Sequence, residues 1–166
     1  MRRLLRAVAW LCAAAALALI LRTCVFGLVK VAGQSMENTL ETGDVALVSR
    51  LDYRLGSIRR GDVAQIRVPG RDGTYLKRVV GLPGEKVELS GGRVFIDGRA
   101  LEEPYARNSQ EEFSIQLGED EYFVLGDNRP VSYDSREEDF GAVSAGCFLG
   151  RVRAVVWPLD RIQLGI

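Results

Sequence analysis

The chain has 166 residues, of which 47% are hydrophobic and 27% are charged, a balance typical of a globular protein with its own core. Its 22 basic and 22 acidic residues cancel to zero net charge, so the basic excess that usually accompanies nucleic-acid binding is absent. The chain contains no histidine, which excludes a Ser-His-Asp triad and any metal site with histidine ligands.

Most of the positive charges are arginines. The three lysines are Lys30, Lys77 and Lys86. A lysine can lose its proton when it is desolvated, whereas an arginine effectively cannot, so each lysine is a candidate for chemistry. The three cysteines are far apart, which favours small buried apolar side chains over a disulfide framework or a zinc site. They are Cys12, Cys24 and Cys147.

The N-terminal segment is predicted to be a transmembrane helix. Residues 7–21 form an uninterrupted apolar run, which is shorter than the about 20 residues that a span needs. Arginines flank the run at Arg6 and Arg22, and their long side chains can reach the two interfaces. A cleaved signal peptide with the triplet Ala-Leu-Ala at residues 16–18 is the alternative; the apolar run continues past this triplet, which disfavours cleavage.

The flanking charges predict the orientation of this anchor. Three arginines, Arg2, Arg3 and Arg6, directly precede the apolar run and one, Arg22, directly follows it, so the N-terminus is expected in the cytoplasm. We therefore expect a single-pass protein of the cytoplasmic membrane. Residues 1–24 would form the cytoplasmic tip and the anchor, and residues 25–166 a domain on the outer face.

This domain is predicted to be mainly β, an antiparallel sheet or a barrel-like fold. Short stretches rich in Val, Ile, Tyr and Phe are separated by glycine-containing turns, which is typical of linked hairpins. These stretches cover residues 45–49, 62–68, 74–82, 86–89, 93–96, 113–117, 121–125 and 151–159. No amphipathic helix of ten residues is expected after the anchor.

Three segments differ from simple strands and turns. In residues 33–40, a glycine allows close approach of the backbone to a ligand and Ser35 follows it; the alternative is that Ser35 caps a helical turn. In residues 75–85, alternation places Lys77 on a face with apolar neighbours, where desolvation would lower its pKa; the alternative is an edge-strand lysine that blocks aggregation. Residues 126–136 are densely polar, either as a solvated loop or as groups that orient a catalytic residue.

These segments resemble the motif boxes of the bacterial type I signal peptidases. In this chain the segment that resembles the serine box is GQSMENTL (33–40), and a strand box is matched by GDVAQIRV (61–68). The lysine box is matched by YLKRVVGLPGE (75–85), and the last box by GDNRPVSYDSREEDFG (126–141). They follow the family's order, and the resemblance extends from the anchor to residue 162. It implies a membrane-bound serine endopeptidase, without metal or cofactor, that removes signal peptides after small residues at Ala-X-Ala-like sites.

The resemblance also implies roles for individual residues. Ser35 would be the nucleophile, neutral Lys77 its general base, and Ser132 the group that orients the lysine. The backbone N–H of Ser35 would donate a hydrogen bond to the oxyanion. Two supporting ion pairs are implied, Asp134 with Arg136 and Asp127 with Arg78. Apolar residues near the boxes would line the pockets for small substrate side chains: Val29, Val31, Met36, Leu40, Ala64, Tyr75 and Leu76.

The chain departs from the family pattern at three places. Asn38 stands where the serine box usually has proline, and Pro130-Val131 replace two polar residues of the last box. Gly33 stands where some members carry a hydroxyl that donates to the oxyanion. Only this last departure touches the mechanism, and it leaves the second oxyanion donor open.

Two other functions compete with this one. A related Ser-Lys peptidase of the same fold, like the LexA-type repressors, would cleave itself or one dedicated partner; the apolar N-terminus argues against it. A membrane-tethered binding domain would use Ser35 and Lys77 only structurally. For the peptidase, the expected partners are preproteins and membrane lipid, without nucleic acid, and the protein would act as a monomer.

Overall fold

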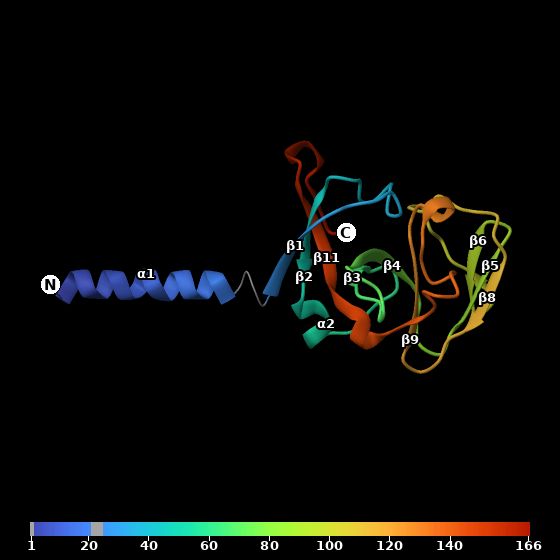
Figure 1. The fold of residues 1–166 in the computed structure, drawn as a ribbon, viewed down its shortest axis with the longest axis horizontal. Coiled ribbons are helices and arrows are strands. Elements are labelled where there is room, and N and C mark those ends of the chain that lie inside the picture. Colours follow the sequence, from blue (N-terminus) through green and yellow to red (C-terminus); the bar gives the residue numbers. More distant parts are fainter. Residues whose placement is uncertain (1, 21–24) are drawn as a thin grey trace.

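A computed structural model describes residues 2–20 and 25–166 of the chain. Helix α1 (Arg2–Ile20) comes first and points away from the strands (Figure 1). A search of the described residues finds no helix that is both long enough and apolar enough to cross a membrane. The predicted anchor also includes residues 21–24, which lie outside the described residues, as does Cys24.

The remaining chain folds into two antiparallel sheets. The larger sheet has the strand order β1-β2-β11-β3-β4-β9-β10, with β12 paired to β11, and the smaller sheet has the order β7-β6-β5-β8. The strands of the larger sheet are β1 (Phe26–Lys30), β2 (Val45–Ser49), β3 (Val63–Ile66), β4 (Tyr75–Gly81), β9 (Glu121–Leu125), β10 (Val143–Ser144), β11 (Phe148–Trp157) and β12 (Gln163–Leu164). Those of the smaller sheet are β5 (Lys86–Ser90), β6 (Arg93–Ile96), β7 (Arg99–Ala100) and β8 (Phe113–Gln116).

Helices after α1 are short. They are α2 (Leu51–Leu55) and the 3₁₀ turns η2 (Arg129–Val131), η3 (Ala145–Cys147) and η4 (Leu159–Arg161). The prediction of a mainly antiparallel β domain is therefore confirmed. In the chain, the strands of the smaller sheet lie between β4 and β9 (Figure 1). β4 contains the lysine of the second candidate segment, and β9 ends directly before the third candidate segment.

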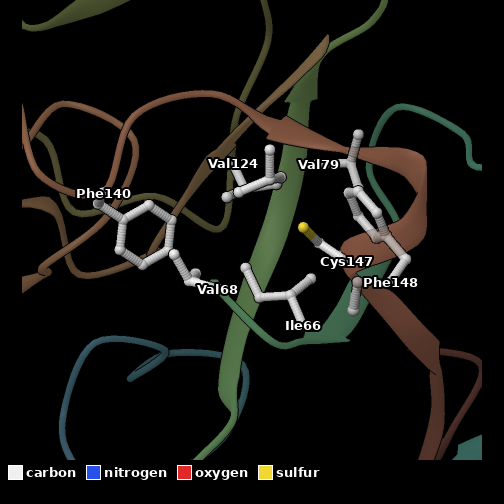
Figure 2. Packing of buried hydrophobic residues seen from close by; sticks show 9 residues of the cluster. Ile66, Val68, Val79, Val124, Phe140, Cys147 and Phe148 are labelled. Carbon is white, nitrogen blue, oxygen red and sulfur yellow. The ribbon is translucent and has the colours of Figure 1, made fainter. Parts of the chain in front are cut away.

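Apolar residues of both sheets fill the core in three clusters. One lies around β3, β4 and β9 and includes Ile66, Val68, Val79, Val124, Phe140, Cys147 and Phe148, whose side chains converge between the strands (Figure 2). A second lies beneath β1, β2 and β11. The third joins the smaller sheet to β4 and β9. Cys147 is buried as predicted. The prediction for Cys12 is wrong: it is exposed, because α1 points away from the strands (Figure 1).

Strand β4 lies inside the larger sheet. It pairs with β3 through Lys77 and Ala64 on one side, and with β9 through Arg78 and Leu125 on the other. Lys77 therefore does not lie on an edge strand, and a role in blocking edge-to-edge aggregation is excluded. Lys77 and Arg78 point to opposite faces of the strand, and both are buried. Both faces of β4 are therefore covered at this position, which alternation alone does not predict.

Candidate active site

The serine loop, residues 31–44, joins β1 to β2. Its ends are closed by hydrogen bonds from Val31 N to Asp44 O and from Gly43 N to Val31 O. Ser35 lies at its turn and is half-buried. Within the described part of the chain, neither the Oγ nor the backbone N–H of Ser35 has a hydrogen-bond partner. Ser35 is therefore not a helix cap, and both groups can meet a ligand.

Three residues of this loop, Gly33, Asn38 and Gly43, have a positive φ, which favours particular side chains. Gly33 has φ +103° and Asn38 has φ +85°; asparagine tolerates positive φ better than most residues, and proline is restricted to about −65°. The Asn38 Nδ2 also donates a hydrogen bond to the carbonyl of Tyr105 at 3.2 Å. The asparagine in place of the family's usual proline thus fits the local backbone.

Ser35 and Lys77 line the same cleft. Its volume is ≈ 230 Å³, and its walls come from residues 29–33, Ser35 and Met36 on one side and residues 74–77 on the other. Five of the seven residues predicted for the substrate pockets are in these walls: Val29, Val31, Met36, Tyr75 and Leu76. The other two, Leu40 and Ala64, are fully buried in the adjoining core clusters instead.

Lys77 is almost inaccessible to solvent, with 2% of its surface exposed. Burial lowers the pKa of its amine to about 8; Asp134 opposes this shift and Arg136 adds to it. The Nζ donates a hydrogen bond to the Oγ of Ser132 at 3.1 Å. The structure thus joins Lys77 to Ser132 and leaves Ser35 nearby on the cleft, without a Lys77–Ser35 hydrogen bond. Catalytic hydrogen bonds often tighten only when the substrate is bound.

Asp134 and Arg136 form a buried ion pair behind Ser132. The Arg136 Nε donates to Asp134 Oδ1 at 2.8 Å, and the Nη2 donates to Oδ2 at 3.0 Å. The same Nη2 also donates to the carbonyl of Ser132 at 3.0 Å. The pair therefore holds the backbone of the residue that contacts the lysine.

Asp127 and Arg78 form the second ion pair, which joins the lysine strand to the serine loop. The Arg78 Nε and Nη2 donate to the two carboxylate oxygens of Asp127 at 2.8 and 2.6 Å. Asp127 also accepts a hydrogen bond from the hydroxyl of Thr39, four residues after the serine. The ring of Tyr105 covers the Arg78 guanidinium at 3.8 Å, which adds a cation–π contact.

Several residues with close contacts to the site were not singled out by sequence. A Cβ at Gly126 would lie 2.2 Å from Ser132 Oγ and 2.5 Å from Ser35 O, so only glycine lets these two serines approach each other here. The backbone N–H of Asn128 donates to Ser35 O at 3.0 Å, and its side chain donates to Gln34 O and to Glu37. The only available sequence signal was the dense polar composition of residues 126–136.

The departure from the family pattern at Pro130-Val131 lies outside this contact set. Pro130 and Val131 form part of η2, and both are exposed. The buried members of the same segment carry the contacts described above: Asp127, Asn128, Ser132 and Asp134.

An antiparallel β domain with a serine and a buried lysine on one cleft is an arrangement compatible with a serine peptidase that works without histidine. The family model described as signal peptidase, peptidase S26, matches residues 4–157. This span is most of the chain, and the chain therefore belongs to the S26 signal peptidase family.

Named relatives agree with this family. The chain is 34% identical over 156 residues to a probable signal peptidase I-2 of Synechocystis, covering 89% of this chain and 71% of the relative. It is 34% identical over 157 residues to a signal peptidase I of Bacillus caldolyticus, covering 85% of each. A crystal structure of a signal peptidase I from Enterococcus faecalis superposes with a TM-score of 0.51 at 32% identity, covering 57% of this chain and 96% of the other.

Proposed function

We propose that this protein is a membrane-bound endopeptidase that removes signal peptides from exported preproteins, with Ser35 as nucleophile and neutral Lys77 as general base. The observation that carries the proposal is the shared cleft, lined by a buried lysine and by a serine whose hydroxyl has no hydrogen-bond partner among the described residues. The pKa of about 8 leaves part of the lysine population neutral near neutral pH, which is the condition for a useful general base.

The first chemical step forms an acyl-enzyme. Ser35 Oγ attacks the scissile carbonyl carbon while its proton passes to Lys77 Nζ. The carbonyl oxygen becomes negatively charged and accepts a hydrogen bond from the backbone N–H of Ser35. This hydrogen bond stabilises the tetrahedral intermediate. When the intermediate collapses, the C–N bond breaks and Lys77 returns the proton to the leaving amine.

Water completes the cycle. Neutral Lys77 takes a proton from a water molecule, whose oxygen attacks the ester carbon. The ester C–O bond to Ser35 then breaks, Lys77 returns the proton to Ser35 Oγ, and the carboxylic product leaves. Ser132 orients the amine in both steps through the hydrogen bond at 3.1 Å. The Asp134–Arg136 pair holds Ser132 in turn, so these polar groups position the base.

The apolar walls of the cleft support the proposed specificity. Val29, Val31 and Leu76 lie in these walls, beside the two reacting side chains. We expect small substrate side chains to pack against them and large ones to be excluded by steric clash, which discriminates between substrates. Ala-X-Ala-like sites, which signal peptides carry, fit this cleft.

Membrane attachment completes the proposal. Residues 1–24 would form the anchor with the N-terminus in the cytoplasm, and residues 25–166 would act as a monomeric domain at the outer surface. The outward face of β1 supports lipid contact beside the anchor, because Phe26 is 40% exposed and Leu28 is 64% exposed. Burial of these two side chains in lipid would contribute roughly 1 kcal/mol or more each.

Cleavage of a preprotein by the purified full-length protein in detergent tests the proposal. N-terminal sequencing of the product should place the cut after an Ala-X-Ala-like triplet, and Ser35→Ala should abolish it. The exposed Ser57 provides a matched control, so Ser57→Ala should cleave at the wild-type rate. Cleavage by Ser35→Ala at the wild-type rate would remove Ser35 as the nucleophile.

A further inference from the structure

Arg129 lies three residues before Ser132 and is fully engaged in a buried ion pair. Its Nη2 lies 2.6 Å from Glu103 Oε1, and its Nη1 lies 3.2 Å from Oε2. The two side chains are 3% and 5% exposed. Glu103 belongs to a different part of the chain, residues 101–108, which lie between β7 and β8 and are here called the connector.

The geometry of this pair points to a role other than stability. A buried ion pair contributes little net stability, because the cost of removing both charges from water offsets their attraction. Here the Arg129 Nε also donates to the carbonyl of Gly126 at 2.9 Å. Gly126 is the residue against which both Ser132 Oγ and Ser35 O pack. The guanidinium thus holds the backbone unit that separates the two serines.

The connector makes further contacts with the same region. The Arg107 N–H donates to Asp127 O at 2.8 Å, and the Arg129 N–H donates to Arg107 O at 2.9 Å. The Tyr105 hydroxyl donates to Glu103 Oε1 at 3.0 Å, while its ring covers Arg78. The smaller sheet therefore reaches the site through the connector, and Glu103 supplies the negative charge of that contact.

We propose that Glu103 is a positioning residue for peptide-bond cleavage. By holding Arg129 against the carbonyl of Gly126, it sets the distance between the backbone of Ser35 and the hydroxyl of Ser132, and through Ser132 the direction of Lys77 Nζ. This inference rests on the proposed function of Ser35 and Lys77. Glu103 and Arg129 are not among the residues that line the cleft, so they act on geometry and leave the substrate-binding walls intact.

Two variants separate positioning from structural support. Glu103→Gln leaves the buried Arg129 without a charged partner, so it is expected to lower both stability and kcat. The double variant Glu103→Leu/Arg129→Met removes both charges, which is often neutral for stability. It also removes the donor to Gly126 O, so kcat should stay low even where the melting temperature recovers.

The expected readout is a split between kcat and KM. In the double variant kcat should fall on the order of tenfold or more, because small displacements of reacting groups are costly, while KM changes little. The matched control is Glu85→Gln, since Glu85 pairs with Arg60 and Arg60 also donates to a backbone carbonyl, that of Val80. This control should keep the wild-type kcat.

A second measurement is independent of cleavage. The chain has only three lysines, so NMR titration of ¹³C-labelled lysine side chains can follow Lys77 with the exposed Lys30 and Lys86 as internal references. The pKa of Lys77 in the double variant should move by about half a unit or more when Ser132 shifts, while the references stay unchanged.

These outcomes distinguish this inference from the proposed function. A wild-type kcat together with an unchanged Lys77 pKa in the double variant would overturn the positioning role and leave the Ser35–Lys77 mechanism intact. Failure of the wild-type protein to cleave would overturn the proposed function, and the titration would still decide whether Glu103 and Arg129 control the lysine.

Discussion

At Lys77, burial and neighbouring charges set the protonation state of the amine. Asp134 favours the charged form of the lysine, whereas desolvation and Arg136 favour the neutral form, and the balance lowers the pKa to about 8. The rarity of lysine made Lys77 a candidate in the sequence. The two-sided cover of β4 could not be predicted, because it depends on pairing with strands that are distant in sequence.

Substitution of this lysine tests the requirement for a neutral base. Lys77→Arg keeps the positive charge but cannot lose its proton, so the cleavage rate should fall about 10²- to 10⁴-fold. Lys86→Arg should be nearly silent, because Lys86 is exposed and forms an ion pair with Glu88 on the surface. Rates should be measured on a preprotein in full-length protein, with thermal melting to check folding.

The pH dependence of the wild-type rate has a definite sign. Because the neutral form of Lys77 is the active one and its pKa is lowered to about 8, the rate should rise as pH increases through about 8 and fall as the lysine is protonated below it. A plot of kcat/KM against pH checks this, since it reports the free enzyme. A flat profile from pH 6 to 9 would argue for a carboxylate base.

Asn38 is a residue where the local backbone, and not the chemistry, determines the choice of side chain. With φ +85°, Asn38→Pro should lower the free energy of unfolding by more than about 1 kcal/mol, whereas Asn38→Gly should change it by less than that. Chemical denaturation of the two variants measures the difference. Equal stability of both variants would mean that residue 38 does not hold a positive φ in solution.

At the scale of the element, the loop over residues 126–136 shows what composition can and cannot predict. Its polar density indicated an orienting role, and the family resemblance implied the two ion pairs, Asp127–Arg78 and Asp134–Arg136, which the structure forms. The contacts of Gly126 and Asn128 with the serine loop could not be inferred, because they join backbone atoms of segments about ninety residues apart. The pairing of Arg129 with Glu103 could not be predicted either, because nothing in the sequence around Glu103 distinguishes it from other acidic residues.

Close packing at Gly126 provides a prediction for this loop. Gly126→Ala would place a Cβ 2.5 Å from Ser35 O, so the two serines must move apart, and kcat should fall on the order of 100-fold. Gly146→Ala is the matched control, since a Cβ there meets only Ser144 Oγ, at 3.9 Å. Cleavage kinetics and melting curves of both variants would show whether the effect is specific to the site.

At the scale of the whole molecule, the β domain and the N-terminal segment make separate contributions. The described side chains of α1 are exposed, and the three core clusters consist of residues from the β domain. The domain therefore has a core that does not depend on α1. The mainly β architecture was predictable from turn spacing, whereas the order of strands in the two sheets was not, because it follows from long-range pairing.

Removal of residues 1–24 tests this separation. The truncated protein should keep its rate on a soluble peptide, because the cleft lies within residues 29–77. It should lose rate on preproteins in vesicles, where an anchored enzyme has the higher local concentration. Equal loss on both substrates would show that the N-terminal segment is needed for folding instead.

The smaller sheet leaves the larger one after β4 and returns at β9. Its hairpin turns, at Gly91-Gly92 and at Asp97-Gly98, have positive φ and lie on the surface, whereas the connector at residues 101–108 touches the site. Insertions and deletions at these hairpin turns would change neither the distance between β4 and β9 nor the position of the connector. Length differences between relatives are thus expected to accumulate at these tips, so that this part of the fold can diverge in size while the reacting groups keep their places.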